Sequence, residues 1–135
     1  MEEIKAKIKQ LLLLSKTEPS REGEFFDNLK AKMQQQEKMW DELKVLAKAN
    51  NTILGRIIKF QHADSYAFYI VTKVNRKAVR LDWIDYCDGW VDSRCGIACF
   101  MDIEYVREEI RRRDALDEMF SENKRKQQLK ERQSA

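Results

Sequence analysis

The strongest structural signal in the chain is ILGRIIKFQHADSYAFYIVTKVNRKAVRLDWI, residues 53–84. This stretch contains three runs rich in β-branched and aromatic residues, which favour strands. The runs are Ile53–Phe60, Tyr66–Val74 and Lys77–Ile84. Ala63-Asp64-Ser65 connects the first two runs, and Asn75-Arg76 predicts a tight hairpin between the second and third. The pattern therefore predicts consecutive antiparallel strands.

Two weaker strand runs follow the Asp88-Gly89 turn. They are Trp90–Arg94 and Ile97–Met101, on either side of Cys95-Gly96. Short antiparallel strands that follow one another so closely are typical of a small closed sheet. We expect an antiparallel β-barrel of the SH3-like or Tudor-like kind.

The residues before the strands, 1–50, predict a helical arm of two helices. The apolar side of the first helix follows a 3.6-residue period. Its residues are Ile4, Ile8, Leu11, Leu12 and Ser15. Pro19 disfavours a helical conformation at Glu18, so the first helix should end there. Ser20 or Gly23 then marks the start of the second helix.

The second helix has a seam of residues spaced alternately three and four apart, as in a heptad repeat. They are Phe26, Leu29, Met33, Gln36, Trp40, Leu43 and Ala47. From Gly23 to Ala49 this helix would be roughly 40 Å long, which a small barrel cannot cover. Three alternatives remain open: the seam packs on the first helix, pairs with a second copy in a homo-oligomer, or does both. A buried Gln36 would suit pairing, since polar seam residues fix register.

A closing helix is predicted from Asp102, a good N-cap. Its apolar stripe consists of Ile103, Val106, Ile110, Leu116, Met119 and Phe120. Beyond Phe120 the stripe ends except for Leu129, so residues 121–135 are expected to be a disordered basic tail. The predicted fold class is α+β, with a helical arm over 1–50, a barrel and helix over 51–120, and a tail.

Composition narrows the classes of partner. The net charge is +3, and residues 121–135 hold five basic against two acidic residues, so residues 1–120 are neutral overall. Nucleic-acid binders usually carry a basic stripe on the folded body, so nucleic acid is not an expected partner. The longest apolar run, Leu11–Leu14, is far shorter than the ~20 residues of a membrane span. No secretory signal is visible, and we expect a cytoplasmic protein without a membrane partner.

Catalytic, cofactor and metal sites are not expected. His62 is the only histidine, and the four glycines are scattered singly, so no phosphate-binding loop is present. The three cysteines are Cys87, Cys95 and Cys99. Together with His62 they offer zinc ligands, but their spacing lacks the C-x₂-C knuckle of such sites. We therefore expect the cysteines to pack as small hydrophobic residues.

An aromatic cluster is the first part of a candidate binding site. Trp83, Tyr86 and Trp90 lie within eight positions, among Asp82, Asp85, Asp88 and Asp92. Tyr66, Phe68 and Tyr69 form a second group on the neighbouring strand. Some of these side chains must fill the core, but a loop this polar predicts at least one at the barrel mouth, where it can stack on a flat ligand.

The closing helix supplies the second part of the site. Arg111 is expected on a solvated face, neutralised by Glu108 and Glu109. Arginine stacks on aromatic rings and binds phosphate in a fork, and a neighbouring carboxylate accepts from hydroxyl or amino groups. The predicted nucleotide site therefore consists of Trp83, Tyr86, Trp90, Arg112, Arg113 and Asp114.

Two stretches resemble known proteins. Residues 7–15, KIKQLLLLS, followed by Glu22-Gly23-Glu24, look like the helical opening of uncharacterised phage and bacterial proteins with a K-I-x-x-L-L-x-L pattern. Residues 55–60, 63–69 (ADSYAFY) and 112–116 (RRDAL) are similar to small phage and prophage proteins. The layout also resembles the Thoeris anti-defence sponge proteins of the first type.

That resemblance implies an oligomer that sequesters cyclic ADP-ribose-type immune signals without degrading them. Adenine would be clamped between an aromatic residue, Trp83 or Tyr86, and an arginine, Arg112 or Arg113. The expected function is therefore phage-encoded, non-catalytic sequestration of a small nucleotide-derived signal, including cyclic dinucleotides, in the host bacterial cytoplasm. The alternative is a protein-interaction inhibitor of the anti-CRISPR type that docks on a host nuclease.

Overall fold

The computed structural model of the protein describes residues 1–17, 23–62, 65–86 and 98–133. The elements in order are α1 (Glu2–Lys16), α2 (Phe25–Ala49), β1 (Ile57–His62), β2 (Ser65–Val74), β3 (Ala78–Tyr86), β4 (Ala98–Asp102) and α3 (Ile103–Gln133). The α+β class and the two N-terminal helices are confirmed. The three main strand runs and the last one are also found, whereas Trp90–Arg94 lies outside the described residues.

The strands form one antiparallel sheet in the order β1-β2-β3-β4. Ile57 pairs with Ile70 between β1 and β2, and Val74 pairs with Val79 between β2 and β3. The predicted hairpin closes through a hydrogen bond of 2.9 Å from the Asn75 N–H to the Ala78 carbonyl. Because each strand pairs with its sequence neighbour, the sheet forms from local contacts.

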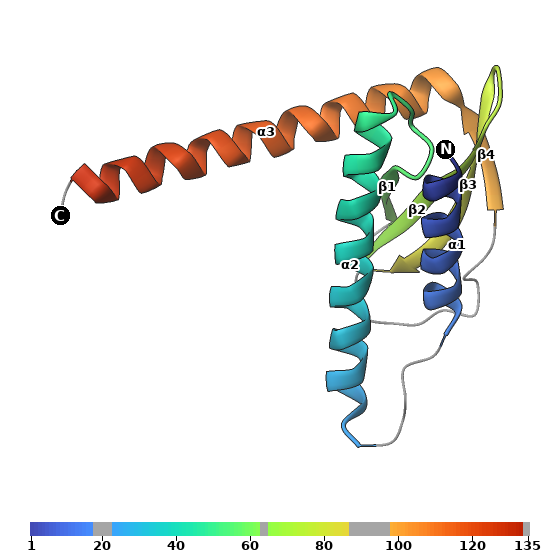
Figure 1. The fold of residues 1–135 in the computed structure, drawn as a ribbon, viewed down its shortest axis with the longest axis horizontal. Helices are drawn as coiled ribbons and strands as arrows, with labels where there is room; N and C mark the ends of the chain where they lie inside the picture. The colour runs from blue at the N-terminus through green and yellow to red at the C-terminus, as the bar shows by residue number, and fades with distance from the viewer. Residues whose placement is uncertain (18–22, 63–64, 87–97, 134–135) are drawn as a thin grey trace.

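The expected barrel is wrong, because the described strands form an open sheet with β1 and β4 at opposite edges. In Figure 1, α1 and α2 stand together against the sheet, and α3 crosses behind one end of it. A small barrel closes so that its sheet can bury its own inner face. Here helices cover both faces, so burial does not require closure.

The first core lies between the sheet and the α1–α2 pair. Its buried residues are Ile4, Ile8, Leu11, Leu43, Leu54, Ile70 and Ile84. The sequence alternation predicts a mostly wet face for Arg80, Asp82 and Ile84, but Ile84 is fully buried and Asp82 is 8% exposed. That prediction is wrong for Asp82 and Ile84, because the helical arm packs on this face, but it is confirmed for Arg80, whose side chain is 45% exposed.

The second core lies on the other face, under the first turns of α3. Its buried residues are Ile58, Val71, Val79, Leu81, Ile103, Val106 and Ile110. The N–H of Ile103 donates to the Lys77 carbonyl at 2.9 Å, which anchors the start of α3 beside the β2–β3 hairpin. Burial on two faces explains why residues 66–71, YAFYIV, are apolar without alternation.

Within the chain, the seam of α2 packs on α1, as the sequence allows. The Gln36 Nε2 donates to the Ser15 Oγ at 3.3 Å, and the Lys32 Nζ donates to the Ser15 carbonyl at 3.2 Å. Leu29 and Leu43 are buried, while Phe26 at the far end of the seam is 81% exposed. Gln36 therefore fixes the register of an intramolecular helix pair.

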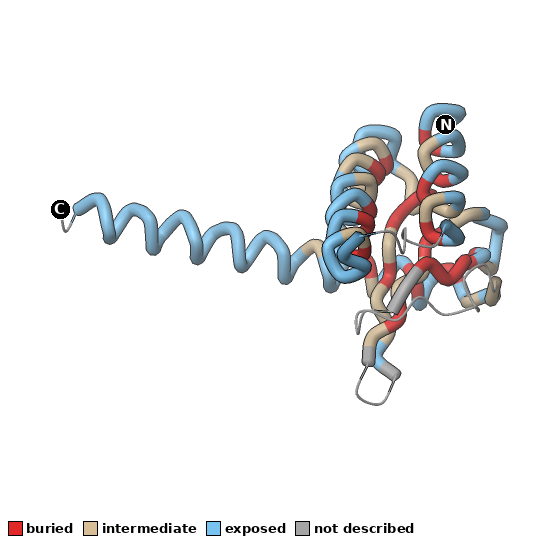
Figure 2. The backbone as a smooth tube through the Cα atoms, turned by 90° about the horizontal axis from the view of Figure 1, so that it is seen from below, coloured by how far each residue is buried: buried red, intermediate tan, exposed pale blue. Residues whose placement is uncertain are grey.

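The C-terminal segment is also different from its prediction. Instead of a disordered tail after Phe120, α3 continues as a helix to Gln133 and projects from the body (Figures 1 and 2). Residues 103–133 contain no Gly or Pro, and the segment is rich in Lys, Arg, Gln and Glu, which favour helices. Among the described residues, no helix has the length and apolar character that crossing a lipid bilayer requires.

Candidate functional site

A cleft lies where α2, α3 and the β1–β2 part of the sheet meet. It has a volume of about 250 Å³. The lining residues are Trp40, Asp41, Lys44, Arg56, Ile57, Lys59, Phe68, Arg113 and Asp117. These side chains combine aromatic rings with four cations and two carboxylates, so the cleft is an amphipathic site with a net positive charge.

The aromatic part of the cleft comes from α2 and β2. The rings of Trp40 and Phe68 lie 4.8 Å apart between centroids at an angle of 40°. Trp40 takes this position because its α2 seam faces the sheet, where Phe68 and Ile70 share one face of β2. The rings thus hold each other in place and present a flat apolar surface beside charged groups.

The cations of the cleft differ in their partners. The Lys59 Nζ lies 3.7 Å from the ring centroid of Tyr66 and 5.9 Å from that of Phe68. The Lys44 Nζ forms an ion pair of 2.9 Å with the Asp117 Oδ2. Within the described part of the chain, no carboxylate lies within 4.0 Å of the Arg113 guanidinium, which differs in this from Arg111 and Arg112. Arg113 is therefore available to an anion.

Asp114 connects the elements around the cleft. Its carboxylate pairs with the Arg56 guanidinium at 2.5 Å, and the ammonium groups of Lys44 and Lys48 lie 3.9 and 4.0 Å away. The Arg56 side chain is 9% exposed and the Asp114 side chain 23%. Charged groups this poorly solvated are stable only when paired. The cluster consequently fixes α3 against α2 and holds the neighbouring Arg113 at the cleft.

A wider groove continues from the cleft along the junction of α2 with α3. It has a volume of about 550 Å³ and shares Lys44 and Asp117 with the cleft. The remaining lining residues are Lys48, Asp114, Glu118, Ser121, Glu122 and Arg125. A ligand longer than the cleft can therefore extend over a second set of polar groups.

The structure does not bring all the residues of the predicted nucleotide site together. Trp83 is only 3% exposed, and its pairing with Tyr69 places it on the α3 side of the sheet, opposite Phe68. A side chain this deeply buried cannot serve as the exposed stacking ring that the sequence predicts. Neither the side chain of Tyr86 nor any part of Trp90 is among the described residues.

The three neighbouring arginines on α3 also point to different surroundings. Arg113 lines the cleft and Asp114 lies beside it, as the predicted site requires. Arg112 does not line the cleft: its side chain is 65% exposed and pairs with Glu109 at 3.4 Å. Arg111 pairs with Glu108 at 3.2 Å on the solvated surface, as predicted.

Sequence reasoning missed Trp40, Arg56 and Lys59 as site residues. The spacing of Trp40 assigns it to the helical seam, and Lys59 is one polar residue within a strand. Neither residue therefore has a local sequence feature that marks it as part of a binding site. Phe68 belongs to the second aromatic group, but sequence alone does not show which ring of that group faces α2. These residues meet only because α2 and α3 converge at β1 and β2.

The cysteines and metal ligands add no chemistry to the cleft. Cys99 is partly buried on β4, and burial raises the pKa of its thiol, with a further increase from the Asp82 carboxylate. Both causes disfavour the thiolate, which is the nucleophilic and metal-binding form. Cys87 and Cys95 lie outside the described residues, and in the remainder no cluster of His, Cys, Asp and Glu has a metal-binding arrangement.

No family model, no curated protein and no solved structure matches this chain. The function of the cleft must therefore be inferred from its own residues.

Proposed function

We propose that this protein binds and sequesters a small nucleotide-derived signal in the cleft between α2, α3 and the sheet. The observation that carries the proposal is the position of Arg113, without a carboxylate partner among the described residues, beside the Trp40–Phe68 ring pair. A base can stack on aromatic rings, and a guanidinium can bind phosphate through forked hydrogen bonds. The pair therefore supplies both contacts that a nucleotide needs.

The size and charge of the site support a ligand larger than a base. A cleft of about 250 Å³ is somewhat smaller than a typical small-molecule site, so it suits a nucleobase with part of its ribose. The adjoining groove, reached through Lys44, gives room for the phosphates or for a second nucleoside. Cyclic ADP-ribose isomers and cyclic dinucleotides have this composition.

Sequestration without turnover is the mode of action that fits the lining residues. Among its described lining residues the cleft presents no serine, cysteine or histidine. Its carboxylates are those of Asp41 and Asp117, and Asp117 is already paired with Lys44. Removal of a host immune signal in the bacterial cytoplasm by a phage or prophage protein is the role that we propose for such binding.

Isothermal titration with cyclic ADP-ribose isomers, cyclic dinucleotides and adenosine monophosphate tests the proposal. Arg113→Ala removes a charge-assisted hydrogen bond of about 1.5–3 kcal/mol, which corresponds to at least roughly tenfold weaker binding. Arg111→Ala is the matched control, because Arg111 is two positions away on α3 and pairs with Glu108. Mass spectrometry of the ligand recovered from the complex should show it unchanged.

Three results would contradict the proposal, the third only in part. If none of the nucleotides binds to the wild-type protein, the protein-interaction inhibitor becomes the better hypothesis. If the Arg111 and Arg113 substitutions weaken binding equally, the effect is one of general positive charge and the cleft is not the site. Chemical conversion of a bound nucleotide would retain the site but reject sequestration.

A further inference from the structure

Beyond Asp114, α3 contacts the body through the ion pair of Asp117 with Lys44 of α2, which accounts for one of its many charged residues. Residues 115–133 are all exposed, and at 1.5 Å per residue they form a rod of roughly 28 Å. Figure 2 shows this rod extending from the body as a continuous exposed helix. Unsupported helices of this length are marginal in water, so the segment calls for a partner.

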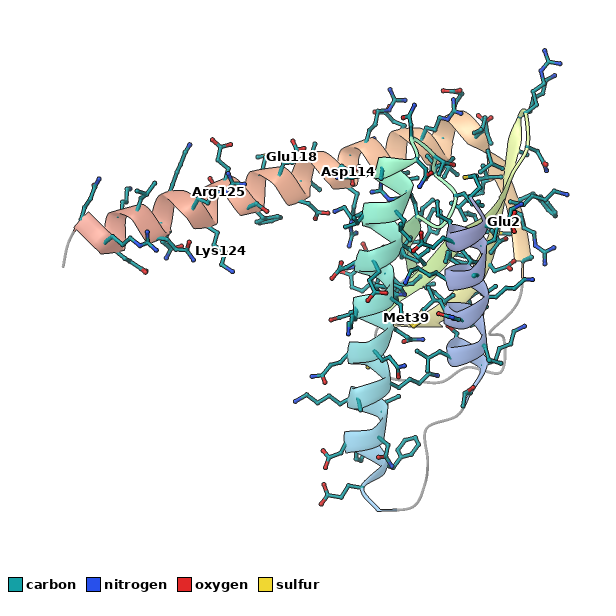
Figure 3. The ribbon with its side chains drawn as sticks, in the orientation of Figure 1. Glu2, Met39, Asp114, Glu118, Lys124 and Arg125 are labelled. Atoms are coloured by element: carbon teal, nitrogen blue, oxygen red, sulfur yellow. The ribbon has the colours of Figure 1, made fainter. Side chains whose placement is uncertain are left out.

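Charge is segregated along the rod into two blocks. Residues 114–122 contain four acids and no base, for a net charge of −4. Residues 123–133 contain five bases and one acid, for a net charge of +4. Figure 3 shows Glu118 in the first block and Lys124 and Arg125 in the second, all on the projecting helix. The two blocks are thus opposite and equal.

This arrangement is unfavourable within a single helix. Like charges stand four residues apart at Asp114–Glu118, Glu118–Glu122 and Lys126–Lys130, where they repel. Only Lys126 and Glu122 form an opposite i,i+4 pair, with 3.5 Å between the Nζ and the Oε1. The macrodipole does not account for the acidic block, since its effect is confined to the first and last turns. Asp114 and Asp117 are matched by Arg56 and Lys44 of the body. The rest of the acidic block and the basic block therefore match something outside this helix and its body.

An apolar stripe accompanies the blocks. Leu116, Met119 and Phe120 are 46%, 59% and 71% exposed, and their i, i+3, i+4 spacing places them on one face of the rod. Asn123 follows Phe120 on the same face, in the position where a polar residue can fix the register of a helix pair. The face has the character of a short helix-pairing surface.

We propose that a second copy of this chain lies antiparallel along residues 114–133 of α3. In that orientation the acidic block of each helix faces the basic block of the other, the two-fold axis lies near Asn123, and Phe120 of each helix lies roughly 9 Å along the helix axis from its counterpart. Parallel pairing would place like blocks together. An antiparallel pair is self-complementary, as a two-fold dimer interface must be. The proposed interface includes Asp117 of the cleft and Glu118, Glu122 and Arg125 of the adjoining groove. Phe120 and Leu129 line neither, so variants at these two positions test the interface separately from the nucleotide hypothesis.

Sedimentation equilibrium of the full chain tests this interface by charge reversal. We expect a dimer at tens of micromolar that weakens as salt is raised, because exposed charges carry much of the interaction. Glu118→Lys with Glu122→Lys should weaken dimerisation at least tenfold, as should Lys124→Glu with Arg125→Glu. All four changes in one chain should restore the dimer, because the blocks are then exchanged. Equimolar mixing of the two double variants should give a heterodimer.

Phe120→Ser and Leu129→Ser are matched variants for the apolar stripe. Both side chains are exposed on the rod, but nine positions place Leu129 about 180° around the helix from Phe120. Only the Phe120 change should weaken the dimer, and circular dichroism should show both variants equally folded. A monomeric wild-type protein, failure of the fourfold reversal to restore the dimer, or equal effects of the two serine variants would each overturn the proposal.

Discussion

Gly55 allows a close approach between the helical arm and the sheet, and its replacement by alanine tests the packing of the first core. The residue has a φ of +83°, a conformation that side chains rarely adopt. A Cβ at this position would lie 3.1 Å from the Leu43 Cδ2 and 3.2 Å from the Ile4 Cγ2. Both neighbours are fully buried, so neither can move aside freely.

The expected loss of stability has two components. Forcing an L-residue into a left-handed conformation costs about 1–2 kcal/mol. Overpacking a close-packed core by a methyl group costs about 1–3 kcal/mol more, because the side chains of Ile4 and Leu43 must leave their preferred rotamers. We therefore expect Gly55→Ala to lower the free energy of unfolding by about 2–5 kcal/mol.

Gly23→Ala separates these components. Gly23 also has a positive φ, +77°, but a Cβ there would meet no atom within 4 Å. This variant should show the backbone cost alone, so urea unfolding at 25 °C should find Gly55→Ala less stable than Gly23→Ala by about 1–3 kcal/mol. Equal losses in the two variants would refute the close approach of Ile4 and Leu43 to Gly55, and with it this placement of α1 against the sheet.

Two further predictions concern the ion-pair cluster and the thiol of Cys99. Asp114→Ala leaves the Arg56 guanidinium buried without its partner and should lower the free energy of unfolding in urea by about 2–4 kcal/mol. Arg56→Met should lower it less, since Lys44 and Lys48 remain near Asp114. Equal losses in the two variants would argue against the cluster. In a Cys87→Ser, Cys95→Ser variant, iodoacetamide at pH 8 should alkylate Cys99 several-fold more slowly in the folded protein than in urea. The reason is that the raised pKa of the Cys99 thiol lowers its thiolate fraction. Equal rates would show an accessible, unshifted thiol.

Local patterns along the chain were sufficient for most of the secondary structure. The 3.6-residue period of Ile4, Ile8 and Leu11 defines the buried side of α1, and the Asn75-Arg76 turn defines the β2–β3 hairpin. These features depend on neighbouring residues and on backbone preference, both of which a sequence displays directly. Helix propensity alone also predicts that α3 continues past Phe120, whereas the end of its apolar stripe predicts disorder there.

The openness of the sheet and the composition of the site depend on contacts between distant segments. Strand periodicity indicates that a face is buried but not what buries it, so the same pattern fits a barrel or a sheet covered by helices. Arg113 is prominent in the sequence, yet its neighbours Trp40 and Phe68 come from α2 and β2 and are brought to it by the crossing of α3 over the end of α2. Trp83, by contrast, is buried on the opposite face of the sheet from Phe68, which its local sequence does not indicate. Residue types and their spacing thus set the elements, whereas burial and proximity follow from the free energy of packing those elements together, which no single segment contains.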